Sequence, residues 1–295
     1  MKAAVIGKYR WTICALLFFA TTINYLDRQV LSLLKPTLEK QFDWSNSDYA
    51  NIASVFQFVY ALSMLFAGRI VDKLGTKWGY AWAIIIWSFA AIIHAFAIPI
   101  GTSIVNILGW VGVAAVPVSI AGFMFSRALL GFGEAGNFPA AIKTTAEYFP
   151  KKERAFATGI FNSGTNVGAI LAPLSVPWIA LHWGWEAAFI IIGAIGFLWL
   201  IAWFIFYEIP AKQSRLSEAE KAFINLKEVK GELILKISDD GIGFDKTKIK
   251  NNWSCQPRNN VKVSSFKSHK LRNCLINEQP IENNLNRNSN CMQNR

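Results

Sequence analysis

SRALLGFGEAGNFPA, residues 126–140, places two charged side chains in an otherwise apolar, glycine-rich segment. Arg127, Gly131 and Glu134 are spaced i, i+4 and i+7, so a helix puts all three on one face. A charge at membrane depth costs at least ~2.5–3.5 kcal/mol, and such charges usually serve a function. We therefore predict a transmembrane helix with a functional charged face. The alternative is an arginine–glutamate pair with a structural role alone.

The composition indicates a polytopic membrane protein that contacts the lipid bilayer. Of 295 residues, 53% are hydrophobic and 17% are charged, a balance too apolar for an ordinary soluble domain. The net charge of +11 does not indicate nucleic-acid binding, because the basic residues lie between apolar segments or in the C-terminal tail. The four cysteines show no C-x-x-C spacing, so we expect neither a disulfide framework nor a zinc site. We also expect no cofactor, no catalytic residue and no enzyme activity.

Apolar segments long enough to cross about 30 Å of hydrocarbon recur along the chain, which predicts an all-α membrane protein with a six-transmembrane-helix bundle. We expect Pro36 to end the first span, and the fourth to continue as an amphipathic helix to Tyr148. Residues 99–117 are apolar but contain prolines and glycines, so they form either an additional interfacial helix or part of a long outer loop. The expected spans are residues 11–34, 49–71, 78–98, 118–138, 155–179 and 186–207.

Lysine and arginine are distributed unevenly between the two sides of this predicted bundle. One side holds the N-terminal segment, the connection at 68–77 and the turn at 150–154, all of them basic. The other side has only Lys35 and Lys40. The positive-inside rule therefore predicts that both ends of the six-span bundle, residues 1–210, are cytoplasmic.

Two motifs carry a resemblance to a known family. GRIVDKLGTK at 68–77 matches the loop signature G-x-x-x-D-[RK]-x-G-x-[RK] at every fixed position, between the second and third spans. RALLGFGEA at 127–135 resembles the fourth-span motif R-x-x-x-G-x-G-x-A of the same family. With NYLDR at 24–28 and GEAGNFPAAIK at 133–143, the chain resembles the major facilitator superfamily, in its anion:cation symporter branch, and is similar to hexuronate transporters. The resemblance covers about residues 8–210, one half of the family's fold, and implies a bacterial inner-membrane location.

The resemblance also implies a function and assigns residues to it. It implies proton-coupled symport of a small organic anion, a hexuronate (glucuronate or galacturonate) or a similar sugar acid. Asp27 and Glu134 would handle the coupling proton. From the residues themselves, we expect Arg127 to orient Glu134 or to pack structurally, as Gly131 does. We also expect Asp72 to pair with Arg69, Lys73 and Lys77 and to latch helix ends as a gate in one state. The implied substrate-binding residues are Tyr25, Arg28, Tyr60 and Thr165, and the implied gating residues are Gly68, Asp72, Lys73, Gly75 and Lys77.

Physical chemistry supports these roles for Arg28 and Glu134. An anionic substrate needs a cation in a low-dielectric cavity, and the planar guanidinium of Arg28 suits bidentate capture of a carboxylate. Coupling needs a carboxylate such as Glu134 that is protonated in one state and charged in the other, while two bundles rock around the site. The alternatives are a snorkelling Arg28 at the membrane surface and an Asp27 paired within the bundle.

The C-terminal quarter does not continue the transporter pattern. We expect a cytoplasmic linker helix within 211–230 and then an unrelated, largely disordered tail at 231–295, because Asn, Ser, Lys and Arg dominate after residue 251. Within the tail, 231–250 resembles the strand and D-x-G-x-G box of histidine-kinase ATP-binding domains, at Asp239, Gly241 and Gly243. We interpret this as a transporter half joined near 225–231 to another fragment. The alternatives are an inert or assembling half-transporter and a membrane-anchored sensor-kinase fragment. The sequence leaves self-association open.

Overall fold

The computed structural model describes residues 7–110, 116–224, 226–229 and 232–235. It divides into two compact units, residues 1–224 and 225–295. The first unit is helical where it is described. The second contains an antiparallel pair of strands, β1 (Leu226–Val229) and β2 (Glu232–Leu235), with Leu226 opposite Leu235.

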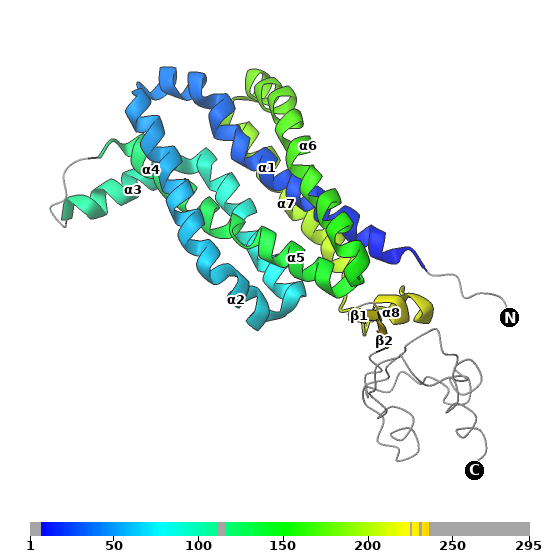
Figure 1. Ribbon diagram of the computed structural model, residues 1–295. Coiled ribbons are helices and arrows are strands. Elements are labelled where there is room, and N and C mark those ends of the chain that lie inside the picture. The colour runs from blue at the N-terminus through cyan, green and yellow to red at the C-terminus, as the bar shows by residue number, and fades with distance from the viewer. Residues whose placement is uncertain (1–6, 111–115, 225, 230–231, 236–295) are drawn as a thin grey trace, which may run out of the picture. The chain divides into compact units, whose positions relative to one another are not determined.

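The helices of the first unit form a bundle in which long helices lie side by side (Figure 1). α1 packs along α6, and α2 packs along α4 and α7. These apolar helices confirm the predicted all-α bundle. Their bounds are α1 Tyr9–Phe42, α2 Asn46–Ile93, α3 Ala97–Trp110, α4 Val118–Glu134, α5 Asn137–Tyr148, α6 Lys151–Trp183, α7 Trp185–Phe206 and α8 Glu218–Ile224, with a short 3₁₀ turn, η1, at His94–Phe96.

Gly75 divides α2 into two arms that match the second and third predicted spans. Its backbone has φ 76° and ψ 158° inside an otherwise helical run. Only glycine adopts such a conformation at little cost, because any Cβ would clash with the neighbouring backbone. The chain therefore reverses direction at Gly75, within the 68–77 connection.

Among the described residues, three stretches are apolar and long enough to cross a membrane by composition alone: Asn46–Trp110, Lys151–Trp183 and Trp185–Phe206. The first contains both arms of α2. The two remaining predicted spans correspond to α1, which carries Asp27 and Arg28, and to α4, which carries Arg127 and Glu134. α4 has 17 residues, so it is shorter than these three stretches although it is also apolar.

Two helix ends differ from the sequence-based expectation. α1 continues through Pro36 to Phe42, since Leu34 and Leu38 are buried on either side and hold the helix despite one missing hydrogen bond. α4, by contrast, ends at Glu134 instead of continuing to Tyr148. Pro139 explains this break, because it cannot bond the carbonyl of Ala135 four residues earlier and its ring crowds that carbonyl.

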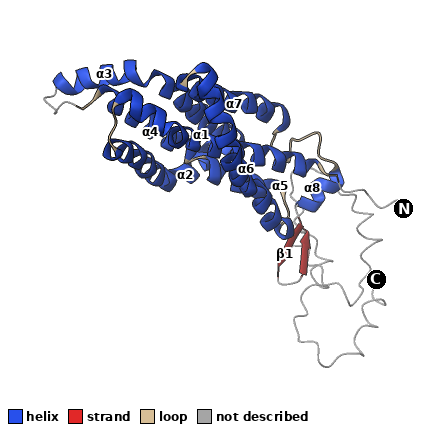
Figure 2. Cartoon of the chain, turned by 90° about the horizontal axis from the view of Figure 1, so that it is seen from above, coloured by secondary structure: helices blue, strands red, loops and turns tan. Residues whose placement is uncertain are grey.

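Residues 97–110 form a helix, α3, which the sequence left undecided between a helix and a loop. Gly101 lies against the backbone of Val118, and Gly122 lies against the backbone of Ala97, so closely that neither position has room for a Cβ. α3 is therefore held on the start of α4, and both views show it projecting from the side of the bundle (Figures 1 and 2).

The predicted linker helix is shorter than expected. α8 covers only Glu218–Ile224, and its start is set by Ser217, whose Oγ accepts a hydrogen bond from the Glu220 N–H. Strand β1 follows at Leu226, which ends the helical pattern. The strand expected around Leu233 overlaps β2, whereas the D-x-G-x-G box and the remaining tail lie outside the described residues.

Two apolar clusters form the core of the bundle. One contains Trp199, Trp203 and the first half of α1 up to Ile23, and the other contains Phe123, Trp185 and α1 from Leu26 onward. Their boundary on α1 falls next to Asp27 and Arg28. The fold thus brings internal charges between two apolar layers.

Candidate functional site

Arg28 and Glu134 form the centre of the site. The Nε of Arg28 on α1 donates a hydrogen bond to Oε2 of Glu134, the last residue of α4. The Glu134 side chain is fully buried, whereas 21% of the Arg28 side chain is exposed. A buried carboxylate therefore holds a cation that still reaches the surface of the bundle.

Aromatic rings surround the guanidinium of Arg28. Its central carbon lies 4.5 Å from the ring centre of Tyr60, 5.1 Å from that of Tyr25 and 5.4 Å from that of Phe56. Phe56 and Tyr60 stack at 5.9 Å. Each ring face attracts the cation, so the three rings fix the direction in which the guanidinium can receive an anion.

Gly131 lets α4 approach this aromatic group. A Cβ at Gly131 would lie 2.7 Å from the carbonyl oxygen of Phe56 and 3.2 Å from the nitrogen of Tyr60. Any larger residue would push α4 away from α2. The structural role expected for Gly131 therefore has a geometric reason, since the same approach brings Glu134 within reach of Arg28.

Asp27, next to Arg28 in the chain, is a second buried carboxylate. The residue is 3% exposed, and within the described part of the chain neither of its carboxylate oxygens has a hydrogen-bond partner. Asn24 Nδ2 and Arg127 Nε are also buried without partners there. Arg127 and Glu134 are the charges that act on Asp27. Buried polar atoms without partners are uncommon and mark functional groups or water sites.

Arg127 was expected either to orient Glu134 or to pack structurally, and it does not contact the carboxylate through an ion pair. Among the described residues it makes no ion pair with Glu134, and its guanidinium lies 5.7 Å from the ring centre of Phe56. Seven helical residues separate Arg127 from Glu134, or about 10 Å along the axis, so their side chains need not meet. Arg28 from α1 takes the position beside Glu134 instead.

Thr165 lies on α6, half-buried, at the contact between α6 and α1. Its neighbours Gly164 and Gly168 face α1, where a Cβ would meet the backbone of Phe18 or of Thr22. Gly168 also faces Tyr25, where a Cβ would lie 3.0 Å from that of the tyrosine. Thr165 is therefore on a helix that contacts the site, and its role in substrate binding stays a prediction.

The gate residues find partners that the sequence did not indicate. Asp72 was expected to pair with Arg69, Lys73 or Lys77, but its Oδ1 lies 2.8 Å from the Nζ of Lys143 on α5. The same Nζ donates to the carbonyl of Val71 at 3.3 Å. Asp72 thus joins α2 to α5 rather than closing on its own connection.

Lys77 pairs with Glu208 just beyond α7, at 2.7 Å. This hydrogen bond from Lys77 lowers the pKa of the Glu208 carboxyl below its ordinary value of 4.5. Lys73 is exposed. Gly68 has open space where a Cβ would stand, so no described helix approaches it closely, whereas Gly75 has the positive φ at which the chain turns.

The same end of the bundle contains residues that the sequence analysis missed. Glu147 accepts hydrogen bonds from Thr76 Oγ1 at 2.5 Å and from the Tyr207 hydroxyl at 2.6 Å. Burial raises the pKa of that hydroxyl. Thr76 and Tyr207 are distant from Glu147 in the sequence, so the pattern could not pair them. The available signal was Glu147 itself, a single acidic residue near the end of an amphipathic helix.

Glu220 on α8 is another such residue. Its carboxylate accepts hydrogen bonds from the backbone N–H groups of Tyr9 and Arg10 at the start of α1, at 3.3 and 3.1 Å. The Arg10 side chain bridges Glu220 and Glu153, at 3.0 and 2.9 Å. α8 is thereby attached to α1 and α6.

The chain is similar to curated transporters of sugar acids. The chain is 34% identical over 215 residues to the hexuronate transporter of Escherichia coli K12, covering 73% of this chain and 45% of the relative. It is 34% identical over 215 residues to the galacturonate transporter of Dickeya chrysanthemi, covering 73% and 56%. A probable galactarate/D-glucarate transporter of E. coli K12 is 32% identical over 217 residues, covering 73% and 46%. The chain thus spans about half the length of the curated relatives it matches.

A solved structure and a family model complete the comparison. The bundle matches the crystal structure of a bacterial homologue of the human lysosomal transporter Spinster, inward-facing and unoccupied, with a TM-score of 0.55 at 22% identity. The match covers 69% of this chain and 44% of that one, so the bundle has the fold of one half of that protein. The model of the Major Facilitator Superfamily matches residues 17–271. The chain therefore belongs to the Major Facilitator Superfamily and is a multi-pass membrane protein.

Proposed function

We propose that this bundle binds the carboxylate of a hexuronate or a similar sugar acid at Arg28, and that the anion crosses the membrane together with a proton. The observation that carries the proposal is the Arg28 guanidinium, held by Glu134 and framed by Tyr25, Tyr60 and Phe56. The names of the relatives, which transport hexuronate and galacturonate, support this substrate class.

Glu134 is the proposed coupling residue because its charge competes with the substrate for Arg28. When Glu134 takes up a proton it loses the charge that holds the guanidinium, and a substrate carboxylate can then form the charge-assisted hydrogen bonds. When the proton leaves, Glu134 recovers Arg28 and the anion is released. Proton and anion therefore bind together and leave together.

The remaining site residues have supporting roles in this proposal. Tyr25 and Tyr60 offer ring faces and hydroxyl groups to the sugar, and Thr165 contributes from α6. Asp27, buried without partners among the described residues, is a second carboxylate that can hold a proton. Gly131 keeps α4 close enough for Glu134 to reach Arg28.

The contacts around the 68–77 connection are the proposed gate. The pairs Asp72–Lys143 and Lys77–Glu208 fasten the end of the bundle that carries the basic connections. Breaking such contacts in one state and forming them in another is how rocking bundles alternate access. The basic residues at this end also support a cytoplasmic position for both ends of the bundle, in the inner membrane of a bacterium.

Transport into proteoliposomes tests the proposal. Purified protein is expected to accumulate labelled glucuronate against its gradient when the inside is alkaline, and not to accumulate glucose, which has no carboxylate. Glu134→Gln is expected to keep exchange of external for internal glucuronate while losing accumulation. Proton-driven accumulation that survives Glu134→Gln unchanged would refute the coupling role.

A half-transporter that must associate with a second half is the other candidate, favoured by the chain's coverage of only about half of each relative. Direct glucuronate binding to purified protein, with its mass measured by light scattering, separates the two. Binding by a species of 33.0 kDa supports a site complete in this chain, whereas binding confined to a larger assembly supports the half-transporter.

A further inference from the structure

Residues 78–126 contain no aspartate, glutamate, lysine or arginine, although they include α3. The second arm of α2 runs from Thr76 to Ile93, a rise of about 27 Å, which nearly spans ~30 Å of hydrocarbon. α3 therefore begins at the side of the membrane opposite Lys77. A helix exposed to water at that point would be expected to carry charges, and this one carries none.

Backbone contacts fix the orientation of α3 on the bundle. Ala97 and Gly101 are buried, and the close approach of Gly101 to Val118 and of Gly122 to Ala97 holds the helix on α4. The opposite side of α3, here called its free side, is exposed at Thr102, Asn106 and Trp110 with respect to the described residues. The helix projects away from the bundle in both views (Figures 1 and 2).

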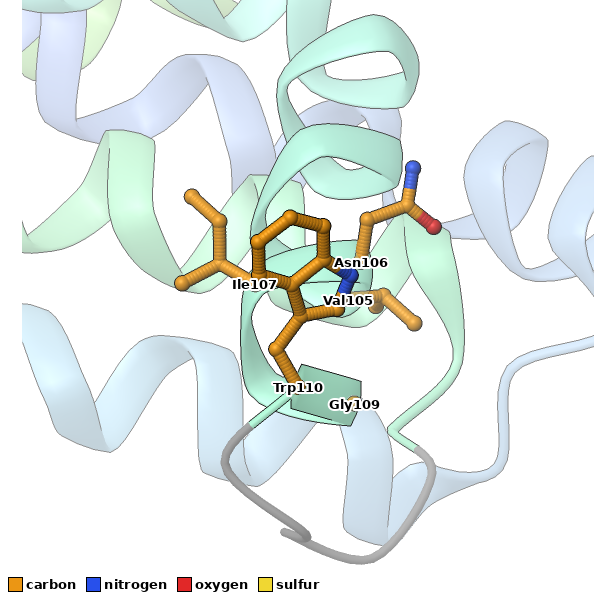
Figure 3. Close-up of a pocket in the computed structure, with 5 residues that line it drawn as sticks. All are labelled: Val105, Asn106, Ile107, Gly109 and Trp110. Atoms are coloured by element: carbon orange, nitrogen blue, oxygen red, sulfur yellow. The ribbon is translucent and has the colours of Figure 1, made fainter.

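The free side of α3 has two flanks of different polarity. Thr102 and Asn106, four residues apart, form a polar flank, and Ile107, about 100° further around the helix than Asn106, lies on an apolar one. Trp110 follows Asn106 by four residues and Ile107 by three, so it lies between the two flanks. Ile107 is 65% exposed and Trp110 is 94% exposed. Figure 3 shows Ile107 and Asn106 pointing to opposite sides of the helix, around a surface hollow of about 450 Å³ that both residues line.

The polar groups of this helix are compatible with lipid. The hydroxyl of Thr102 donates to the carbonyl of Ile98 at 3.0 Å, and that of Ser103 donates to the carbonyl of Pro99 at 3.1 Å. These hydroxyls are satisfied within their own helix and need no water. An exposed indole next to an uncharged polar flank is the arrangement that membrane–water interfaces favour.

We propose that α3 lies in the membrane–water interface on the side opposite the basic connections, with Ile107 and Trp110 in the acyl boundary and Asn106 toward the headgroups. The occupant of the free face is thus lipid. Because α3 is held on the start of α4, this contact also fixes α4 relative to the bilayer, at the helix that carries Arg127 and Glu134.

Adjacent cysteines on the two flanks test this proposal with a matched pair. In a background with serine at Cys14, Cys255, Cys274 and Cys291, the variants Asn106→Cys and Ile107→Cys are labelled with a charged maleimide in open membranes and in vesicles of purified protein. We expect Ile107→Cys to react roughly tenfold more slowly than Asn106→Cys in both, because its thiol lies several Å below the headgroups. Lys212→Cys, exposed outside the spans, and Leu198→Cys, exposed on α7, set the fast and slow limits.

Equal labelling of the two positions in vesicles would overturn the proposal. Slow labelling in cell membranes combined with fast labelling in vesicles would overturn it too, because another protein and not lipid would then cover the flank. A nitroxide on the same two cysteines gives a second measurement that does not depend on thiol reactivity. Greater oxygen than nickel-chelate accessibility at 107, and the reverse at 106, is the expected result.

Discussion

Arg28 and Glu134 are 106 residues apart in the chain and are joined by a hydrogen bond that ties α1 to α4. The bond uses the Nε edge of the guanidinium, while three aromatic rings surround the group. The planar shape of the Arg28 guanidinium, more than its charge, is therefore expected to decide how well this residue binds an anion.

Arg28→Lys is expected to weaken glucuronate binding although the charge is kept. An ammonium cannot offer the planar fork that binds a carboxylate with two parallel hydrogen bonds. Loss of one charge-assisted hydrogen bond, worth about 1.5–3 kcal/mol, corresponds to a Kd roughly tenfold to a hundredfold weaker. Calorimetric titration of purified protein measures this, with Arg28→Ala as the null reference. A lysine variant with wild-type affinity would show that point charge alone suffices.

Gly131→Ala is expected to lower both stability and affinity. The added Cβ would meet the carbonyl of Phe56 at 2.7 Å, and such overpacking costs about 1–3 kcal/mol. Gly159→Ala on α6 is the matched control, because that position has open space and a helical backbone. Thermal unfolding in detergent should show a lower Tm for Gly131→Ala and an unchanged or higher Tm for Gly159→Ala. Equal Tm values in the two variants would contradict the close approach of α4 to α2.

Gly75→Ala should destabilise the protein through its backbone alone. The residue has φ 76°, and a Cβ in that conformation costs roughly 1–2 kcal/mol. Gly68→Ala, in the same connection, has open space and helical dihedrals, so it should be neutral or slightly stabilising. Denaturation of both variants under identical conditions makes the comparison. A transport defect in a stable Gly68→Ala protein would indicate that the helices approach each other there in another state.

The Lys77–Glu208 pair predicts a specific pH dependence of stability. Because the folded pKa of Glu208 lies below 4.5, the unfolded chain binds the proton more readily, and the pair stabilises the fold above that pH. The stabilisation should fade as pH falls through the folded pKa. Tm is therefore expected to differ between wild type and Glu208→Gln at pH 6, and the difference should shrink below pH 4.5. A difference that grows in acid would contradict the assignment.

An exchange of charges tests the partner of Asp72. Asp72→Lys should repel Lys143 and impair transport, and Lys143→Asp should restore it in the double variant. The effect on stability should stay within about 1 kcal/mol, since exposed ion pairs contribute little. Uptake rates of the three variants give the answer. Rescue by Arg69→Asp in place of Lys143→Asp would favour pairing within the connection.

The sequence predicted well what depends on local pattern. Apolar periodicity located the bundle, and the motif positions located the Gly75 turn and the buried carboxylates Asp27 and Glu134. The sequence also contains Pro139, four residues after Ala135, which predicts the end of α4.

Partners that are distant in sequence could not be predicted from pattern. Asp72 has three basic neighbours in its own connection, yet packing brings Lys143 from α5 closest. Arg127 shares a helix face with Glu134, yet Arg28 from α1 forms the ion pair with Glu134. Which cation reaches a carboxylate depends on how helices approach one another, and glycines such as Gly131 set that approach.

The formal charges of the site's four charged side chains sum to zero: Asp27, Arg28, Arg127 and Glu134. One monoanion loaded with one proton leaves that sum unchanged, so the loaded step would be electroneutral. The membrane potential, worth about 2.3 kcal/mol per charge per 100 mV, would then neither drive nor oppose it. A second proton on Asp27 would add one positive charge and make accumulation voltage-dependent. Under the proposed mechanism, the protonation of Asp27, whose carboxylate has no hydrogen-bond partner among the described residues, would decide whether the cell's electrical gradient, in addition to its pH gradient, can power uptake.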